Sequence, residues 1–140
     1  MQPEIIRILT ENFPISELSL NSYYKTCKCI VIDKDRNCRI VSKNNEIDFQ
    51  IASIAFIINS KNEICTFVTD KDFRGKHYGE NLLTCLTEIY DGLSLYVRVS
   101  NIPAIKLYKK VGFEIKDVKK DFYNYTDINE DAYYMEYSKR

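Results

Sequence analysis

The sequence predicts an α/β fold, with one strongly twisted mixed sheet of six or seven strands and helices on both faces. From residue 63 onward, the patterns follow the order strand, loop, helix, strand, helix, strand. That order implies a right-handed crossover and two neighbouring parallel strands. Before it lie two strand patterns around a polar turn and the continuous apolar run Phe49–Ile58, which is long enough for a buried central strand.

Apolar periodicity and turn residues define the expected elements of the N-terminal half. The polar turn Asp33–Asn37 separates two short apolar runs and indicates a hairpin. Ser60-Lys61-Asn62 turns the chain into the next strand. The expected elements are, in order, a strand Ile5–Leu9, a helix Ile15–Thr26, hairpin strands Lys28–Ile32 and Cys38–Val41, and strands Phe49–Ile58 and Glu63–Thr69.

The C-terminal half shows clearer helix signals. Apolar residues recur at helical spacing from Tyr78 to Tyr90, and Asp91-Gly92 ends that helix. Alternation from Leu93 to Val99 predicts a strand. Asn101 supplies N-cap chemistry for a second helix that ends at Gly112. Two final strands are expected around a polar loop, at Phe113–Ile115 and Ala132–Tyr137.

Composition sets the broad class. The 140 residues fit a single domain spanning 1–140, with 45% hydrophobic and 29% charged residues. The net charge is zero, so neither nucleic acid nor a membrane surface is an expected partner. No signal peptide is recognisable, and the five cysteines have no metal-ligand spacing. We expect a cytoplasmic protein with free thiols and no metal, as a monomer or homodimer.

The stretch Asp70–Gly79 is the strongest functional signal. It joins a strand to a helix through a short loop with Gly75 and Gly79, so that several backbone N–H groups meet at a helix N-terminus. Such a junction suits a phosphate or diphosphate, and Arg74 and Lys76 add positive charge. A nucleoside-triphosphate loop is excluded because no Ser or Thr follows Lys76.

Two motifs in this half resemble the GCN5-related N-acetyltransferase (GNAT) superfamily. The first is the cofactor motif Arg/Gln-x-x-Gly-x-Gly/Ala, which here reads RGKHYG over 74–79. The second is the segment LYVRVSNIPAIKLYKKVGF, with Asn101, Tyr108 and Gly112 in the expected places. The resemblance covers Glu63 to about Tyr137. His77 stands where the family usually has Gly, which is possible if its dihedral angles are ordinary.

The resemblance implies acetyl-CoA as the cosubstrate of an N-acetyltransferase. Backbone groups of Phe67, Val68 and Thr69 would bind the pantetheine arm and polarise the thioester carbonyl. Asn101 would hydrogen-bond the same arm, cap the following helix, or do both. The diphosphate would lie against Arg74, Gly75, Lys76, His77, Tyr78 and Gly79.

The same resemblance suggests catalytic residues. Tyr108 occupies the family's general-acid position, and the alternative is a core aromatic residue. Glu63 matches the base of histone-acetylating members, and the alternative is a solvated carboxylate at a strand end. Ribosomal-protein N-terminal acetyltransferases place a Glu before the conserved Asn, where this chain has Tyr96. Cys65 could be a nucleophile or a small buried hydrophobe.

The C-terminal tail resembles the ending of protein N-terminal acetyltransferases, so Tyr133 and Tyr134, with Tyr123 and Tyr125, are candidate acceptor-binding residues. The alternative is an ordinary polar hairpin rich in sheet-favouring Tyr. We therefore expect direct acetyl transfer in a ternary complex to a primary amine of a protein or peptide. The rivals are an aminosugar-phosphate or other small-amine acetyltransferase and a catalytically silent CoA-binding interaction domain.

Overall fold

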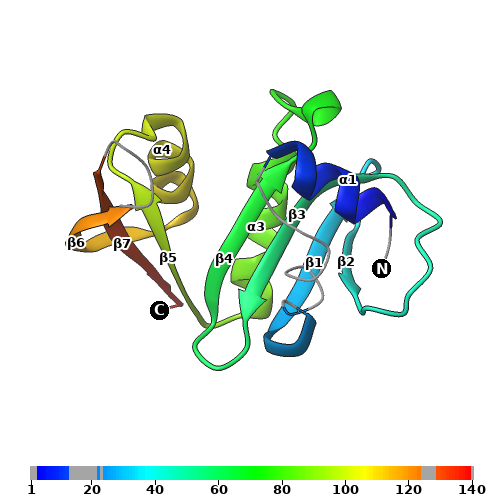
Figure 1. Cartoon of the computed structure of the whole chain (residues 1–140), viewed down its shortest axis with the longest axis horizontal. Coiled ribbons are helices and arrows are strands. Elements are labelled where there is room, and N and C mark those ends of the chain that lie inside the picture. The colour runs from blue at the N-terminus through cyan, green and yellow to red at the C-terminus, as the bar shows by residue number, and fades with distance from the viewer. Residues whose placement is uncertain (1–2, 13–21, 23, 124–128, 140) are drawn as a thin grey trace.

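A seven-stranded sheet with the order β2-β1-β3-β4-β5-β7-β6 organises the chain (Figure 1). The computed structural model describes residues 3–12, 22, 24–123 and 129–139. Its strands are β1 (Cys27–Asp33), β2 (Cys38–Val41), β3 (Ile51–Ile58), β4 (Glu63–Thr69), β5 (Gly92–Arg98), β6 (Glu114–Tyr123) and β7 (Glu130–Ser138). Its helices are α1 (Pro3–Asn12), the short 3-10 helix η1 (Lys71–Phe73), α3 (Tyr78–Ile89) and α4 (Ile102–Val111).

The strand predicted at Ile5–Leu9 is wrong, because these residues lie within helix α1. Ile5, Ile8 and Leu9 are buried and lie on one helical face. A short apolar run fits a strand or a helix equally well by periodicity, and packing against β3 and β4 decides for the helix. Most of the helix predicted over 15–26 lies outside the described residues, although 24–26 are helical.

The hairpin and the central strands are confirmed. Strand β1 pairs antiparallel with β2 and β3, and β3 pairs antiparallel with β4. Strand β3 is buried along nearly its whole length, as its continuous apolar run predicted. These four strands form the first half of the sheet, and β5, β7 and β6 form the second.

The two halves meet at the parallel pair β4–β5. Only Glu63–Ser94 and Ile64–Leu95 are paired there in the described part of the chain, and the strands then diverge (Figure 1). An irregularity in the β3–β4 register skips Cys65, immediately after the last β4–β5 pair. The edge of β4 that faces β5 is therefore open from Cys65 to the end of the strand.

The predicted polar loop after Ile115 is also wrong, because β6 continues to Tyr123 and pairs with β7. Its side chains are almost all exposed, so the sequence lacks the apolar alternation of a half-buried strand. The ladder to β7 holds the strand, and the register shifts twice along it. Charged residues and irregularities are typical of an edge strand that avoids pairing with another chain.

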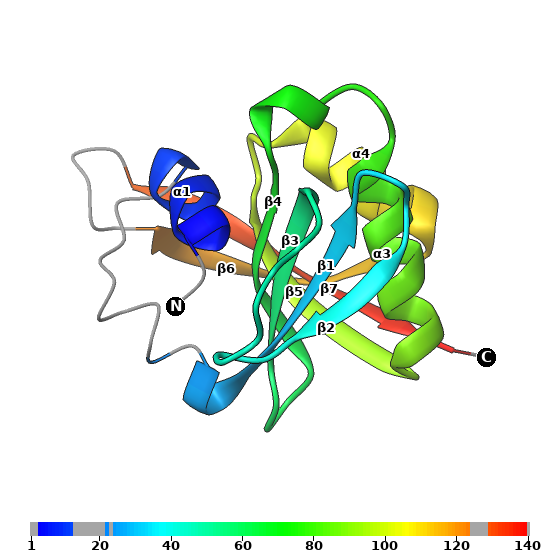
Figure 2. The ribbon, with the colours of Figure 1, turned by 90° about the vertical axis from the view of Figure 1, so that its right-hand side faces the viewer.

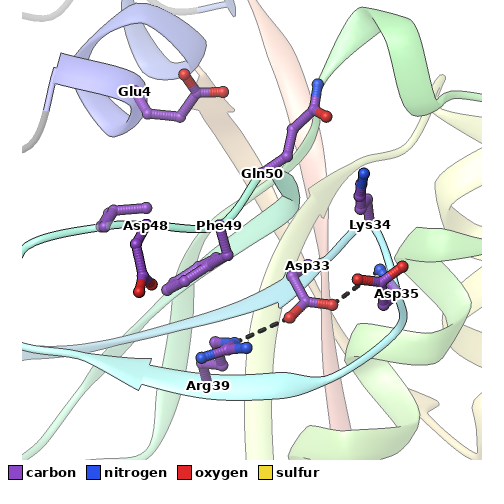
Figure 3. A pocket seen from close by; sticks show the side chains of 9 residues that line it. Glu4, Asp33, Lys34, Asp35, Arg39, Asp48, Phe49 and Gln50 are labelled. Carbon is purple, nitrogen blue, oxygen red and sulfur yellow. Dashed lines mark hydrogen bonds and ion pairs between the residues drawn. The ribbon is translucent and has the colours of Figure 1, made fainter.

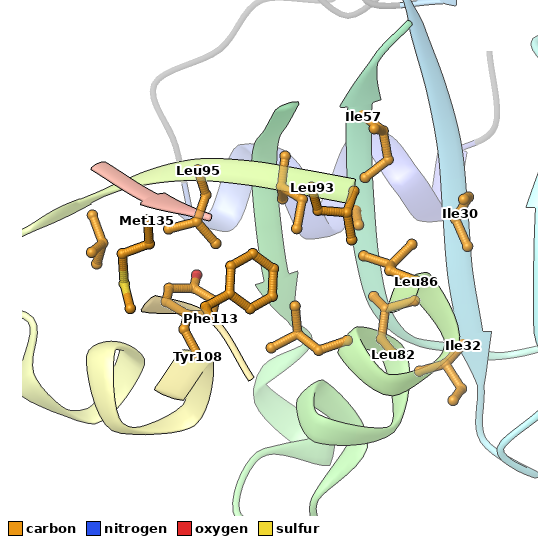
Figure 4. Packing of buried hydrophobic residues seen from close by; sticks show 14 of the residues in the cluster. Ile30, Ile32, Ile57, Leu82, Leu86, Leu93, Leu95, Tyr108, Phe113 and Met135 are labelled. Atoms are coloured by element: carbon orange, nitrogen blue, oxygen red, sulfur yellow. The ribbon is translucent and has the colours of Figure 1, made fainter. Parts of the chain in front are cut away.

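Two apolar clusters pack on opposite faces of the sheet, as alternating side chains along β1 and β3 require. Helices α3 and α4 cover one face, and α1 covers the other (Figures 1 and 2). The cluster under α3 and α4 joins both halves, since it contains Ile57 from β3, Leu95 from β5 and Met135 from β7 (Figure 4). The predicted fold class and its helices on both faces are confirmed.

Candidate active site

The loop between η1 and α3 has a conformation shaped by two left-handed residues. Gly75 has φ +76°. His77, the residue before α3, has φ 68° and ψ 16°. The expected condition of ordinary dihedral angles at His77 is therefore not met. His is among the residues that tolerate this region best, and its exposed side chain lies 3.9 Å from Glu80.

Gly79 lets the first turn of α3 approach β4 closely. A Cβ atom at this position would lie 3.3 Å from Thr69 Oγ1 and 3.5 Å from the Phe67 ring. The helix N-terminus is thus held directly beside the end of the open β4 edge. The first backbone N–H groups of a helix have no partner within it, so this junction can bind an anion.

Arg74 folds the loop back onto the protein. Its Nε donates to Thr69 O at 3.1 Å, and its Nη2 donates to Asn12 Oδ1 at 2.6 Å. The guanidinium therefore ties the loop to the last residues of β4 and α1. A second tie lies beside it, since Arg7 of α1 pairs at 2.9 Å with the buried carboxylate of Asp70.

The open edge of β4 carries Phe67, Val68 and Thr69, the residues predicted to bind a pantetheine arm. Backbone donors and acceptors on an unpaired strand edge can pair with an extended ligand as they would with another strand. Asn101 lies across the opening, after β5, and its Oδ1 accepts the Ala104 N–H at 3.4 Å. It caps α4, and its contact with a cofactor stays a prediction.

Tyr108 reaches from α4 across to β4. Its ring centroid lies 6.2 Å from that of Phe67 at an interplanar angle of 72°, and Phe113 packs at 5.8 Å. The residue is 9% exposed, and burial raises the pKa of its hydroxyl to about 12. Tyr108 is thus both a core aromatic and a phenol that stays protonated at neutral pH, which suits a proton donor.

Glu63 lies at the closed end of the β4–β5 opening. Its side chain is 14% exposed, and a carboxylate oxygen lies 3.5 Å from Lys61 Nζ. The neighbouring Ile64 belongs to the same cluster as Tyr108, so strand alternation places Glu63 on the opposite face. A base on one face and an acid on the other would let an acceptor amine and a thioester meet from opposite sides of the sheet.

A cavity of about 420 Å³ lies on the Glu63 face, over β5, β7 and the edge strand β6. It is lined by Lys61, Glu63, Ser94, Tyr96, Lys116, Asp117, Lys119 and Tyr134. Both of its carboxylates are paired with its own lysines, Glu63 with Lys61 and Asp117 with Lys119. The cavity therefore offers tyrosine surfaces and compensated charges rather than a strongly negative pocket.

The structure separates the two tyrosines proposed for acceptor binding. Tyr134 lies beside Tyr96 in the cavity, with ring centroids 5.0 Å apart. Tyr133 packs against the cluster on the other face, because neighbouring strand residues point to opposite sides. Tyr123 holds the Arg98 guanidinium 4.0 Å above its ring. Tyr125 lies outside the described residues.

Sequence reasoning did not propose Tyr96, which lines the cavity, or Phe122, which packs on it, as part of the site. Their rings stack with centroids 4.5 Å apart, and Phe122 is 43% exposed. Alternation along Leu93–Val99 was a usable signal, because it places Tyr96 opposite the buried Leu95. No comparable signal existed for Phe122, which lies in a stretch of charged residues expected to be a loop.

Cys65 is poorly suited to be a nucleophile. Its Sγ lies 3.8 Å from Cys27 Sγ and donates to Phe56 O at 3.5 Å. Although part of Cys65 is exposed, the protein around its thiol raises the pKa to about 12, so the reactive thiolate is scarce at neutral pH. In the described residues no group of three or more His, Cys, Asp and Glu is placed to bind a metal, and no helix is long and apolar enough to cross a membrane.

Comparison with known proteins agrees with this geometry. The model of the acetyltransferase (GNAT) family matches residues 3–113. A Bacillus subtilis (strain 168) protein named as a ribosomal protein bS18-alanine N-acetyltransferase is 36% identical over 85 residues. That match covers 57% of this chain and 55% of the relative, so the chain spans about half the length of this curated relative.

Solved structures share the fold. A Bacillus subtilis acetyltransferase in complex with CoA matches with a TM-score of 0.73 at 17% identity, covering 99% of this chain and 93% of that one. Arabidopsis thaliana Naa50, in complex with the bisubstrate analogue CoA-Ac-MVNAL, matches with a TM-score of 0.57 at 27% identity. This second match covers 64% of this chain and 66% of that one.

Proposed function

Because the chain belongs to the acetyltransferase (GNAT) family, we propose that it transfers an acetyl group from acetyl-CoA to a primary amine of a protein or peptide. Two relatives support this acceptor class. One is named for acetylating an alanine of a ribosomal protein, and the other was solved with a CoA-linked peptide analogue.

The observation that carries the proposal is that the candidate cofactor site and the candidate acceptor site lie on opposite faces of the sheet. The open β4 edge and the α3 junction lie beside Tyr108, whereas Glu63 lies in the tyrosine-lined cavity on the other face. A peptide can lie along such a surface with its amine directed into the β4–β5 opening. A polyamine carries several positive charges and would bind better to a cavity with unpaired carboxylates. Both carboxylates of this cavity are already paired with lysines, which favours a peptide over a polyamine.

The proposed roles follow from the chemistry of thioester aminolysis. The N–H groups of residues 67–69 and of the 74–79 loop would hold acetyl-CoA in the opening. The neutral amine attacks the carbonyl carbon, and the carbon–sulfur bond then breaks. Glu63 would accept the proton that the amine loses, directly or through water, and Tyr108 would donate its proton to the leaving thiolate.

A thiol-release assay across acceptor classes tests the acceptor. We expect coenzyme A release with peptides that have a free N-terminal amine and none with the same peptides acetylated beforehand. Faster release with polyamines or aminosugar phosphates would overturn the peptide acceptor. Tight CoA binding without turnover of any acceptor would instead support a silent CoA-binding domain.

A further inference from the structure

Arg36, in the turn between β1 and β2, contacts both the loop of residues 74–79 and helix α3. Its Nη2 donates to the carbonyl oxygen of Lys76 at 2.9 Å, and its Nη1 donates to Asn81 Oδ1 in α3. The guanidinium also lies over the Tyr78 ring, with Cζ 4.0 Å from the ring centroid. Tyr78 also contacts the backbone of the same turn, since its hydroxyl donates to Lys34 O at 2.6 Å.

Hydrogen bonds and an ion pair of Asp33 stabilise the conformation of this turn. The buried carboxylate of Asp33 accepts the backbone N–H of Asn37 at 3.0 Å. It also accepts the N–H of Asp35 at 2.9 Å, on the same oxygen (Figure 3). Its other oxygen pairs with Arg39 Nε at 2.9 Å. Arg36 itself has φ 68°, a region that favours glycine, so the turn keeps a long cationic side chain where a smaller residue would fit more easily.

The contact with Lys76 sets the direction of a backbone donor. In a planar trans peptide the C=O and the following N–H point in opposite directions. Because Arg36 holds the Lys76 carbonyl toward the β1–β2 turn, the His77 N–H points away from the turn. That N–H belongs to the loop that leads into α3, where backbone donors would meet a diphosphate.

We propose that Arg36 is a positioning residue for the diphosphate of coenzyme A. It acts through the Lys76–His77 peptide and the first turn of α3, not by touching the ligand. This inference rests on the proposed function, since it takes acetyl-CoA as the occupant of the loop. Both terminal nitrogens of Arg36 already donate to protein acceptors, and its guanidinium lies over the Tyr78 ring.

The test compares Arg36→Ala with Lys34→Ala by calorimetric titration with CoA and by steady-state kinetics. Lys34→Ala is the matched control, because it removes a positive charge from the same turn. It keeps the contact of Lys34 with Tyr78, since that contact is made by the Lys34 backbone carbonyl. We expect Arg36→Ala to weaken CoA binding and raise KM for acetyl-CoA by about tenfold, the effect of losing a charge-assisted hydrogen bond and its support. Both kcat and KM for the acceptor should stay near wild-type values, and Lys34→Ala should change none of them.

Two further readouts separate positioning from charge and from misfolding. Arg36→Lys keeps the charge without the planar fork, so it should recover less than half of the lost affinity. Hydrogen exchange of Arg36→Ala without ligand should be faster in residues 74–81 and unchanged in residues 83–89.

Wild-type CoA affinity in Arg36→Ala, full recovery in Arg36→Lys, or an equal loss in Lys34→Ala would each overturn the proposal. If the wild-type protein itself fails to bind CoA, the proposed function fails instead. The exchange comparison then still shows whether Arg36 holds the loop.

Discussion

At the scale of single residues, position on the sheet decides what each aromatic side chain can do. Tyr108 and Tyr133 contribute to the cluster under α3 and α4, whereas Tyr96 and Tyr134 face the Glu63 cavity. Tyr108 differs from ordinary core residues in bridging α4 to Phe67 at the open edge of β4. We therefore propose that its hydroxyl would lie beside a thioester held on that edge.

Replacing Tyr108 with Phe should lower kcat by about a hundredfold or more, the usual contribution of a general acid. The Kd for CoA should barely change, because the ring and its contacts with Phe67 and Phe113 remain. Stopped-time thiol release and calorimetric titration measure the two quantities. Tyr137→Phe is the matched control, since this ring also packs on Phe113 but belongs to β7. Unchanged turnover in Tyr108→Phe would remove Tyr108 as the acid.

At the scale of elements, the β1–β2 hairpin depends on one buried carboxylate. Burial by itself raises the pKa of Asp33. Hydrogen bonds from the Asn37 backbone, Arg39 and the Asp35 backbone more than offset burial and hold the pKa below its ordinary value of 3.8. A carboxylate whose pKa is lower in the folded state stabilises that state above its unfolded pKa. The stabilisation is lost as the pH falls through the folded pKa.

We therefore expect Asp33→Asn to lower the free energy of unfolding by about 1–3 kcal/mol at pH 7, the cost of weakening hydrogen bonds to a buried charged group. The gap between the two proteins should shrink as the pH drops below 3.8, because Asp33 is then protonated in the unfolded chain first and, below its lower folded pKa, in the native protein as well. Urea unfolding at several pH values measures it. Asp35→Asn changes an exposed carboxylate in the same turn and should show no such gap. A gap for Asp33→Asn that is constant down to pH 2 would contradict the role assigned to its charge.

At the scale of the whole molecule, the described residues of the two half-sheets share an apolar cluster and one short parallel contact. The strands diverge where we propose that the ligand binds, so this ligand would touch β4 and α3 in one half and Asn101 and Tyr108 in the other. Binding should therefore link the stability of the two halves.

Coenzyme A at a hundred times its Kd should stabilise the fold by about 2.7 kcal/mol, which is the mass-action effect of a ligand that binds the native state alone. Thermal unfolding with and without CoA measures this. Hydrogen exchange should slow both at residues 67–69 and at residues 101–108. Adenosine 3′-phosphate 5′-diphosphate, which lacks the pantetheine arm, should protect residues 74–79 but leave β4 unchanged. The absence of any stabilisation by CoA would contradict binding in the opening.

Local signals were sufficient for much of this molecule. Helices α3 and α4, the hairpin β1–β2 and the parallel pair β4–β5 were predicted because each has its own periodicity, cap or glycine. The same signals failed at residues 5–9, where a short apolar run fits two structures, and in β6, where charged side chains hide a strand held by its backbone ladder. Local signals also missed Phe122, because it lies in this charged strand.

By itself, the sequence determined the order of elements from β4 to α4, and it predicted a phosphate-binding loop between β4 and α3. Those properties depend on neighbours along the chain, such as Gly75, Gly79 and Asn101. Only the tertiary structure decided that Phe122 of β6 stacks on Tyr96 of β5 and that Arg36 holds Lys76, forty residues away. Contacts of that kind arise when the sheet brings distant segments together, and no local pattern records them.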